Sequence, residues 1–325
     1  MPAFTHIPVM LPEVLNALQP RPGQVFLDGT LGGAGHSCAL LERILPDGFL
    51  WGCDQDGDAL KAAAERLGAV PGSAGRWATK EMNFAGLATW VPAGSCDGVL
   101  LDLGVSSHQL DTPERGFSFQ HDGPLDMRMS HRTPMTAADV VNGWAAGELA
   151  RVFWELGDEP EGRRIARAIE RERAVRRFET TQQLADAVAK VCPRGGRKSH
   201  PATRVFQALR LVVNDEMGVL DQGLLGAFQC LRPGGRLAVL TFHSLEDRKV
   251  KAFMRETARE YLLPPGQPDD PLLRIPCTPA ATLVTRRSVQ PSDAEIAANP
   301  RCRSAQLRVL ERRPQPLTSP TPHAR

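Results

Sequence analysis

Short runs of apolar residues alternate with stretches of helical length in the early part of this chain. The runs Val25–Asp28, Phe49–Cys53 and Gly98–Leu103 are almost continuously apolar, as strands are when both of their faces are buried. A fourth run, Arg236–Phe242, follows a helical stretch that ends in Pro-Gly-Gly. Strands and helices that alternate in this way predict an α/β fold built on a doubly wound parallel sheet.

About 130 residues separate the third run from the fourth, whereas a helical crossover between parallel strands needs only a dozen or more. Much of this interval has a helical pattern, so we expect an inserted helical domain over residues 110–205. The sheet domain then consists of residues 1–109 and 206–313. Its last part holds two strand-like segments, TLVTRRSVQ and RSAQLRVLERR, which we expect to pair at one edge of the sheet. The proline-rich stretch Tyr261–Ala281 is predicted to be an ordered loop, and the tail 314–325 is expected to be disordered.

A glycine-rich loop follows the first apolar run. Asp28 ends that run, and the segment up to His36 contains Gly29, Gly32, Gly33 and Gly35 before a helical stretch begins. Glycine lets the backbone adopt φ > 0 and lets a ligand approach closely, and the start of a helix offers unpaired N–H donors. The next apolar run ends in Asp54, and an acid at the end of the second strand can accept hydrogen bonds from ribose hydroxyls. The pattern therefore predicts a site for a cofactor that contains a nucleoside.

The loop departs from the motifs that bind phosphate groups. A dinucleotide fingerprint counted from Gly33 requires a glycine where this chain has Cys38, and no Gly-Lys-Ser/Thr follows as in a P-loop. An acidic residue before the glycines suits a cation better than a pyrophosphate. S-adenosyl-L-methionine carries an ammonium and a sulfonium but no phosphate, so it fits this loop. A glycine turn in an unrelated α/β protein is the alternative explanation.

Composition places the chain among globular proteins that lie outside the membrane. Its 325 residues are 42% hydrophobic and 23% charged, and no apolar run is long enough for a membrane span. The N-terminus shows no secretion signal. The seven cysteines are scattered and form no C-x-x-C pair, which indicates reduced, mostly buried thiols in a cytoplasmic protein without a disulfide framework or a metal site.

Charge is distributed unevenly along the chain. Residues 1–150 hold 17 acidic and 9 basic side chains, whereas residues 151–210 hold 14 basic and 8 acidic ones, and residues 274–325 hold 9 basic and 3 acidic ones. Seven arginines lie within Arg163–Arg177 alone. This distribution predicts one side that holds a cofactor and another that binds a polyanion such as RNA. Helices that are merely solvated are the alternative.

Four further segments are long and distinctive. They are DGVLLDLGVSSHQLDTPERGFSFQHDGPLDMRMS (Asp97–Ser130), HPATRVFQALRLVVNDEM (His200–Met217), LRPGGRLAVLTFHSLEDRKVKAFM (Leu231–Met254) and NPRCRSAQLRV (Asn299–Val309). In this order, and together with the glycine loop, they closely resemble the bacterial small-subunit rRNA cytosine-N4 methyltransferases, often called the MraW family. The resemblance covers residues 5–313.

The resemblance implies a Rossmann-like S-adenosylmethionine methyltransferase fold in which the inserted helical domain recognises the substrate. It implies S-adenosyl-L-methionine as methyl donor, the exocyclic N4 of a decoding-centre cytosine in 16S rRNA as acceptor, and small-subunit ribosomal RNA or the 30S subunit as partner. Carried over by motif, the residues that bind the cofactor are Ala34, Gly35, His36, Asp54, Phe84, Asp102 and Gln109. His108 departs from the family, which commonly has proline there; a proline fixes φ and stiffens the loop that holds Gln109.

The acceptor side has three candidate catalytic residues. Many amino-methyltransferases carry an acidic or amide residue, Pro-Pro and an aromatic residue after the fourth strand, and this chain has Asp102-Leu103-Gly104-Val105 there instead. Asp102 is therefore a candidate for contact with the cofactor, the acceptor amine or both. Asp126 and His243 are further candidates, although Asp126 is also suited to cap a turn and His243 to be a hydrogen-bonded structural residue. His200 is expected to orient the inserted domain.

Three other functions fit part of the sequence. A methyltransferase acting on DNA or on a protein amide would share the cofactor loop but leave the motifs of the inserted domain unexplained. An assembly factor that binds rRNA without catalysis does not need an intact GGAGH motif with Asp54, Asp102 and Gln109. A nicotinamide oxidoreductase is disfavoured by the incomplete dinucleotide fingerprint.

Overall fold

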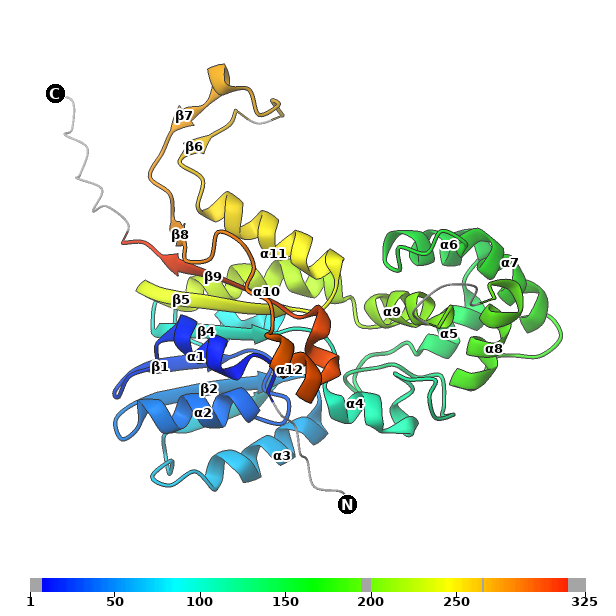
Figure 1. Cartoon of the computed structure of the whole chain (residues 1–325), viewed down its shortest axis with the longest axis horizontal. Helices are drawn as coiled ribbons and strands as arrows, with labels where there is room; N and C mark the ends of the chain where they lie inside the picture. The colour runs from blue at the N-terminus through cyan, green and yellow to red at the C-terminus, as the bar shows by residue number, and fades with distance from the viewer. Residues whose placement is uncertain (1–7, 194–199, 265, 315–325) are drawn as a thin grey trace. The chain divides into compact units, whose positions relative to one another are not determined.

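The computed structural model describes residues 8–193, 200–264 and 266–314. The chain divides into two compact units (Figure 1). We call the first the sheet unit; it spans Ile7–Asp54, Ala59–Gly104 and Leu220–Arg325. We call the second the helical unit; it includes Gln55–Asp58 and Val105–Val219. Each unit has a hydrophobic core of its own.

A seven-stranded sheet forms the framework of the sheet unit, with the strand order β3-β2-β1-β4-β5-β9-β8. Neighbouring strands from β3 through to β5 are parallel, whereas β9 runs antiparallel to β5 and to β8. The fold is thus the Rossmann-like α/β fold that the sequence predicts. Its strands are β1 (Val25–Asp28), β2 (Phe49–Asp54), β3 (Trp77–Glu81), β4 (Cys96–Asp102), β5 (Leu231–Thr241), β8 (Ala281–Leu283) and β9 (Gln306–Arg312).

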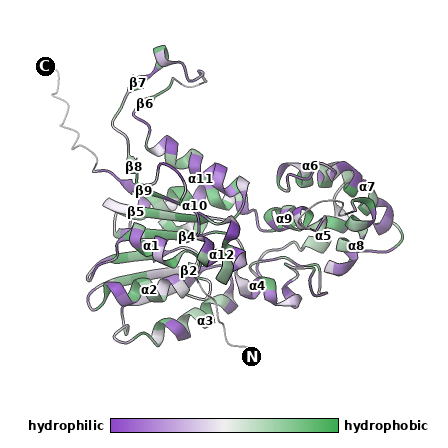
Figure 2. Ribbon diagram, viewed as in Figure 1, coloured by the Kyte–Doolittle hydropathy of each residue, from purple (hydrophilic) through white to green (hydrophobic). Residues whose placement is uncertain are grey.

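Strand β1 lies at the centre of this sheet, between β2 and β4. Its residues Phe26 and Leu27 are fully buried, as are Leu100 and Leu101 on β4, and Figure 2 shows hydrophobic colouring along the central strands. The order of the strands reverses at β1, because β2 and β4 lie on opposite sides of it. In open α/β sheets, ligands bind outside the carboxyl ends of the strands at such a reversal.

Within the described residues, six helices belong wholly or mainly to the sheet unit. Helix α2 packs against β1 and β2, and α11 packs against β5, β8 and β9. The proline-rich stretch, predicted to be a loop, contains a small two-stranded sheet of β6 (Tyr261–Leu262) and β7 (Ile275–Pro276). The helices are α1 (Leu11–Leu18), α2 (Gly35–Ile44), α3 (Gly57–Gly68), α10 (Glu216–Cys230), α11 (Ser244–Thr257) and α12 (Asp293–Ala298), with 3-10 turns η1 (Phe84–Thr89), η3 (Pro271–Leu273) and η4 (Pro300–Ser304).

The helical unit is built from short helices around a core of aliphatic and aromatic side chains. Threonine N-caps begin α5 and α8 and form capping boxes with Asp139 and Gln183, which satisfies N–H groups that a helix start leaves unpaired. The elements are α4 (Ser107–Asp111), η2 (Pro113–Arg115), α5 (Ala137–Gly143), α6 (Ala146–Glu155), α7 (Gly162–Arg173), α8 (Thr181–Val191) and α9 (Ala202–Val213).

The observed unit is wider than the range 110–205 expected from sequence. Helix α9 lies beyond residue 205 for most of its length, and its residues Phe206, Leu209 and Val213 belong to the core of this unit. The functional division into a sheet domain and a substrate domain stays a prediction.

The edges of the sheet and the end of the chain also bear on the sequence predictions. Strand β3 was not expected, because its residues are half-buried or exposed and lack the apolar run that marks a central strand. The paired segments predicted near the C-terminus are confirmed as β8 and β9, which form an edge of the sheet. The tail predicted to be disordered lies, from residue 315 on, outside the described residues.

Candidate functional site

Three carboxylate residues end three neighbouring strands of the sheet. Asp28 is the last residue of β1, Asp54 of β2 and Asp102 of β4. Because these strands are parallel, their carboxyl ends meet at one edge. The glycine-rich loop leaves β1 at this edge and leads into α2. That these residues bind the cofactor stays a prediction.

The glycine-rich loop is held in a fixed conformation. Gly32 has a φ of 48°, and its N–H donates to Asp54 Oδ2 at 2.8 Å. Ala34 is also left-handed, with a φ of 57°, and is the N-cap residue of α2. At Gly35 a Cβ atom would lie 3.2 Å from Pro8, so glycine permits close packing at that position. The loop backbone is thus shaped before any ligand binds.

A chain of hydrogen bonds joins the ends of β1 and β4. The backbone N–H of Asp102 donates to Thr30 Oγ1 at 2.6 Å. Asp28 accepts from the Thr30 N–H at 3.0 Å and from Ser37 Oγ at 2.7 Å. Burial raises the pKa of Asp28, although these hydrogen bonds favour its ionised form. Asp28 therefore fixes the start of the loop.

His36 faces the carboxyl group of Asp102. Its Nε2 lies 2.9 Å from the carbonyl oxygen of Val9, and its Nδ1 lies 3.6 Å from Asp102 Oδ2. Among the described residues, the buried Oδ1 of Asp102 has no hydrogen-bond partner. Burial lowers the pKa of His36 to about 4. Burial, together with the negative charges of Asp28 and Glu246, raises the pKa of Asp102 to about 8.

Phe84 lies beside the glycine-rich loop. It begins η1, which Asn83 caps by accepting from the N–H of Ala85 at 3.0 Å. A Cβ atom on Gly223 of α10 would overlap the Phe84 ring at 2.1 Å, and one on Gly29 would lie 3.4 Å from Phe84 Cβ. Phe84 is thus wedged close to the start of the loop, where a half-buried aromatic ring can form an apolar wall.

His243 has a structural task at the start of α11. Its Nδ1 accepts from the N–H of Glu246 at 3.4 Å, and Glu246 Oε2 accepts from the N–H groups of Phe242 and His243 at 2.8 and 3.3 Å. His243 Nε2 lies 3.0 Å from Glu246 Oε1, without the angles of a hydrogen bond. His243 is therefore the N-cap of this helix, and its catalytic role stays a prediction.

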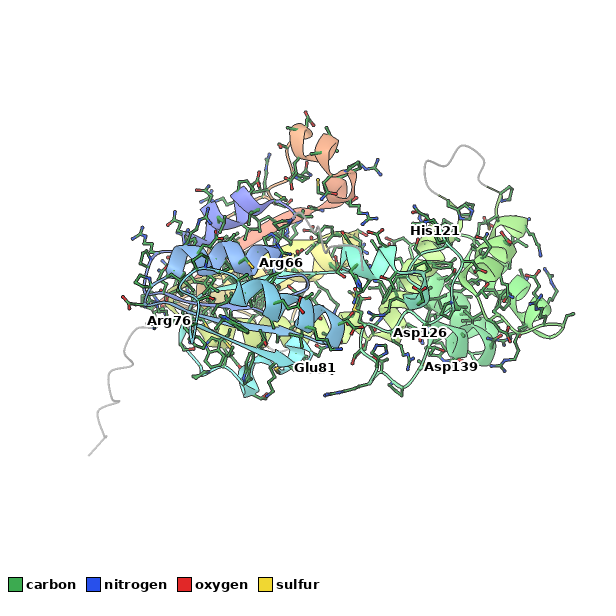
Figure 3. All side chains as sticks on the ribbon, turned by 90° about the horizontal axis from the view of Figure 1, so that it is seen from below. Arg66, Arg76, Glu81, His121, Asp126 and Asp139 are labelled. Carbon is green, nitrogen blue, oxygen red and sulfur yellow. The ribbon has the colours of Figure 1, made fainter. Side chains whose placement is uncertain are left out.

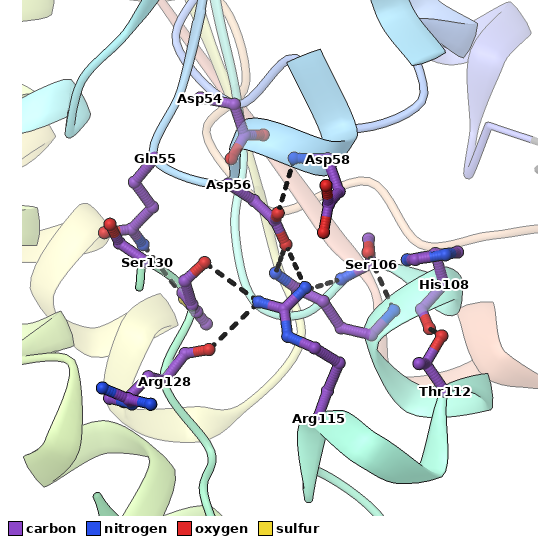
Figure 4. Close-up of polar contacts among 12 residues, drawn as sticks. Asp54, Gln55, Asp56, Asp58, Ser106, His108, Thr112, Arg115, Arg128 and Ser130 are labelled. Carbon is purple, nitrogen blue, oxygen red and sulfur yellow. Dashed lines mark hydrogen bonds and ion pairs between the residues drawn. The ribbon is translucent and has the colours of Figure 1, made fainter. Parts of the chain in front are cut away.

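In the helical unit, Gln109 takes part in a buried network (Figure 4). Asp56 Oδ2 accepts from Arg115 Nη1 at 2.7 Å and from Gln109 Nε2 at 2.9 Å, and Gln109 Oε1 accepts from the N–H of Ser106. Burial alone would raise the pKa of Asp56, but the hydrogen bonds from Arg115 and Gln109 lower it below the usual value. Gln109 therefore orders its own loop, and its predicted contact with the cofactor is untested.

Asp126, which Figure 3 labels, lies on a loop of the helical unit between η2 and α5. Its carboxylate accepts from Arg128 Nε at 2.9 Å and Nη2 at 2.8 Å. Burial would raise the pKa of Asp126, but the hydrogen bonds from Arg128 lower it. Asn214 accepts from the Met129 N–H and donates to the carbonyl oxygen of Met127. Asp126 is thus an ionised, paired carboxylate, and its catalytic role stays a prediction.

The site residues predicted from sequence are distributed over both units. Those of the sheet unit lie at the carboxyl edge of the sheet or next to it, whereas Gln109 and Asp126 belong to the helical unit. Sequence reasoning missed Thr30, Arg115 and Asn214, which hold the site segments in place. No periodic pattern marks such residues, because each acts through contacts with residues that lie far away in the sequence. The predicted set is Ala34, Gly35, His36, Asp54, Phe84, Asp102 and His243 in the sheet unit and Gln109 and Asp126 in the helical unit.

The sheet-unit residues fit a positively charged ligand. Asp102 presents a buried oxygen without a partner in the described part of the chain, and no lysine or arginine described there forms an ion pair with it. A carboxyl group with a buried oxygen of this kind gains from an opposite charge nearby. The ammonium and sulfonium groups of S-adenosyl-L-methionine carry such charge, and the contact of Asp54 with a ribose stays a prediction.

The helical unit also carries a basic groove of about 800 Å³ between α6 and α7. The ring of Trp154 lines it and is 62% exposed. Arg163 and Arg167 are exposed on α7, whose Ile165 and Ile169 face the core. The apolar side of this helix is therefore buried. The groove is lined by Ala146, Gly147, Ala150, Arg151, Trp154, Glu159, Pro160, Gly162, Arg163 and Arg167.

Sequence similarity extends over almost the whole chain. Residues 3–313 match the MraW methylase family. The ribosomal RNA small subunit methyltransferase H of Symbiobacterium thermophilum is 49% identical over 310 residues, covering 95% of this chain and 96% of that protein. The protein of the same name from Syntrophotalea carbinolica is 50% identical over 315 residues, covering 95% and 98%. Among solved structures, TrmN from Thermus thermophilus is 14% identical with a TM-score of 0.42, covering 93% of this chain and 48% of that chain.

Proposed function

The chain belongs to the MraW methylase family, and on this premise we propose that it methylates the exocyclic N4 of a decoding-centre cytosine in 16S rRNA. Relatives that share about half of their residues with this chain are named ribosomal RNA small subunit methyltransferase H. The cofactor of the chain is S-adenosyl-L-methionine. The observation that carries the proposal is this family match over residues 3–313. The three carboxylates around the glycine-rich loop support it, because they suit a cationic donor.

When bound, S-adenosyl-L-methionine supplies a methyl group on a positively charged sulfur, which an amine attacks in line as the carbon–sulfur bond breaks. The chain must hold the cytosine amine in line and accept its hydrogen bonds, because positive charge develops on the nitrogen. Alignment of the two reactants alone lowers the activation barrier by several kcal/mol, and positioning as a whole can lower it by up to about 7–11 kcal/mol. Asp102 is the first candidate for this electrostatic role, since it ends the strand beside the cofactor loop. Asp126 and His243 are the other candidates.

The basic groove supports an RNA substrate. Arginines contact phosphate groups and position a nucleic acid, and an exposed aromatic ring stacks on unpaired bases whatever their identity. A cytosine in folded RNA must leave its stack to reach a buried donor, so unpaired nucleotides are expected next to the target. Trp154 with Arg163 and Arg167 provides both kinds of contact on one surface. We assign this surface to the RNA around the target base.

Two further features agree with this function. Within the described residues, no helix is long and apolar enough to span a membrane. The seven cysteines form no disulfide in the described part of the chain, and five of them are buried. We place the protein in the cytoplasm, where ribosomal subunits assemble.

The test is methyl transfer from labelled S-adenosyl-L-methionine to ribosomal RNA. Purified protein is incubated with naked 16S rRNA, with isolated 30S subunits and with large-subunit RNA as a control. We expect label only in small-subunit RNA, and digestion to nucleosides should yield N4-methylcytidine. Label in another nucleoside, or equal labelling of large-subunit RNA, would contradict the proposal.

A further inference from the structure

Asp102 lies among other ionisable groups that all belong to the sheet unit. His36 faces it from α2, Asp28 from the end of β1 and Glu246 from α11, where His243 is the N-cap. No lysine or arginine of the described residues forms an ion pair with it. Three carboxyl groups thus lie near two histidines, and a permanent positive charge described beside them, that of Arg308, is paired with Asp247 and not with Asp102.

The two neighbouring carboxyl groups are stabilised as anions. Asp28 accepts hydrogen bonds from the N–H and hydroxyl groups of Thr30 and from the Ser37 hydroxyl. Glu246 accepts from two backbone N–H groups at the start of α11. Asp102 receives no such donor: Oδ1 has no hydrogen-bond partner among the described residues, and Oδ2 faces only His36 Nδ1. A proton shared by this cluster is therefore most stable on Asp102.

The orientation of His36 also favours a proton on Asp102. Its Nε2 lies 2.9 Å from the carbonyl oxygen of Val9, which can only accept a hydrogen bond, so Nε2 carries the ring proton. In neutral histidine, Nδ1 is then an acceptor. A lone pair 3.6 Å from Asp102 Oδ2 repels a carboxylate but attracts a protonated carboxyl group.

From this geometry we infer that ligand-free protein holds one proton on Asp102, facing His36, and that this proton is released when the positively charged methyl donor binds. The inference rests on the proposed function, because it takes S-adenosyl-L-methionine as the ligand. His36 is then a positioning residue that keeps Asp102 neutral until the donor arrives. A neutral site costs little to bury in the free protein, and the anion forms only when its counter-charge is present.

The direction of the pH dependence follows from linkage. The pKa of Asp102 in the free protein is raised to about 8, and a cation in the site lowers it. Between these two values, binding releases a proton, so donor affinity rises with pH. The increase in donor affinity approaches tenfold per pH unit from pH 6 to 7.5, and the affinity levels off above about pH 8.

The test is calorimetric titration of the full-length protein with S-adenosyl-L-methionine at pH 6.5 in buffers of different ionisation enthalpy. We expect close to one proton released per donor bound by the wild type. The donor's own α-amino group titrates near pH 7.7–8.0, so the Asp102 contribution is the difference between wild type and Asp102→Asn. That variant is expected to release about one proton fewer and to lose the pH slope.

Asp54→Asn is the matched control, since Asp54 also ends a strand at this edge. It is expected to bind more weakly but to release the same number of protons as wild type. Equal proton release by wild type and Asp102→Asn would overturn the inference, as would binding by wild type without any buffer-dependent heat; both results leave the donor assignment standing. Absence of binding by wild type would instead contradict the proposed function, and the inference with it.

Discussion

Asp102 has two possible tasks at the scale of a single residue. As a half-buried carboxyl group facing His36, it can compensate the positive charge of the donor. As the last residue of β4, it can also stabilise the charge that develops on the cytosine amine. The two tasks differ in what they change: the first sets donor affinity, whereas the second sets the rate once the donor is bound.

Asp102→Asn distinguishes these tasks. The substitution keeps the size of the side chain and one acceptor oxygen but removes the charge. If Asp102 stabilises the transition state, the single-turnover rate at saturating S-adenosyl-L-methionine should fall about 10²–10³-fold, as for loss of one well-placed electrostatic contact. Asp54→Ala is the control: it should raise the donor Kd and leave the saturated rate near that of wild type. A wild-type rate in Asp102→Asn would direct attention to Asp126 and His243.

At the scale of elements, buried polar networks fix the segments that carry the site. Arg115 is 9% exposed and Asp56 is 2% exposed, and Arg115 also donates to the carbonyl oxygens of Arg128 and Met129. One guanidinium group therefore joins the segment after β2, η2 and the loop of Asp126. Removing one member of a buried pair leaves an uncompensated charge, which is far more destabilising than breaking a pair on the surface.

Arg115→Met tests this network. It should lower the free energy of unfolding of the helical unit by about 3–5 kcal/mol, because Asp56 then stays buried without its charged partner. Arg151→Met is the matched control, since Arg151 pairs with Glu155 at 3.7 Å while both side chains are more than half exposed; its cost should be below about 1 kcal/mol. Denaturant unfolding followed by circular dichroism measures both. Similar costs for the two variants would show that the network is not a stabilising element.

At the same scale, the basic groove is expected to contribute to the affinity for RNA. Trp154→Ala should weaken binding of 16S rRNA by about 1–3 kcal/mol, the usual value of one stacked base, and leave the salt dependence unchanged. Arg163→Gln with Arg167→Gln should instead make the slope of log K against log salt less steep, by about 0.7 per lost contact to a single strand. Leu225→Ala, which truncates an exposed side chain of α10, is the control and should change neither. Filter binding at several salt concentrations separates these outcomes.

The sequence predicts those elements whose signal is local. The buried strands β1, β2, β4 and β5 follow from their apolar runs, and the loop that precedes α2 follows from its glycines. Strand β3 could not be found, because an edge strand with exposed side chains has no such run. Asp54 could be predicted as a site residue, but its bond to Gly32 could not, since it joins residues that only the fold brings together. The hydrogen bonds of Arg115 with Asp56 and of Asn214 with Met127 and Met129 could not be predicted for the same reason.

At the scale of the whole molecule, we propose that the sheet unit binds the methyl donor and the helical unit binds the RNA. The sheet unit carries the glycine-rich loop with Asp54 and Asp102, and the helical unit carries the basic groove. The helical unit nevertheless includes Gln55–Asp58, which directly follows β2. The part of the chain after Asp54 is thus held by Arg115, which lies in the predicted substrate domain, and by Gln109, which is predicted to bind the cofactor.

A variant in which a short glycine–serine linker replaces Val105–Val219 tests this division. The sheet unit keeps its own core, so the variant should still bind S-adenosyl-L-methionine, while methyl transfer to 16S rRNA should fall to background because the RNA surface is gone. Asp56 loses both Arg115 and Gln109 in this variant, so Asp56→Ser is included to avoid a buried unpaired charge. Gln109→Ala in the full chain is the matched control for the donor: if Gln109 is the one cofactor contact removed, the two proteins should have similar donor Kd values by calorimetry. Normal methylation by the shortened protein would refute the substrate-domain assignment, and loss of donor binding beyond that of Gln109→Ala would show that the helical unit helps to build the cofactor site.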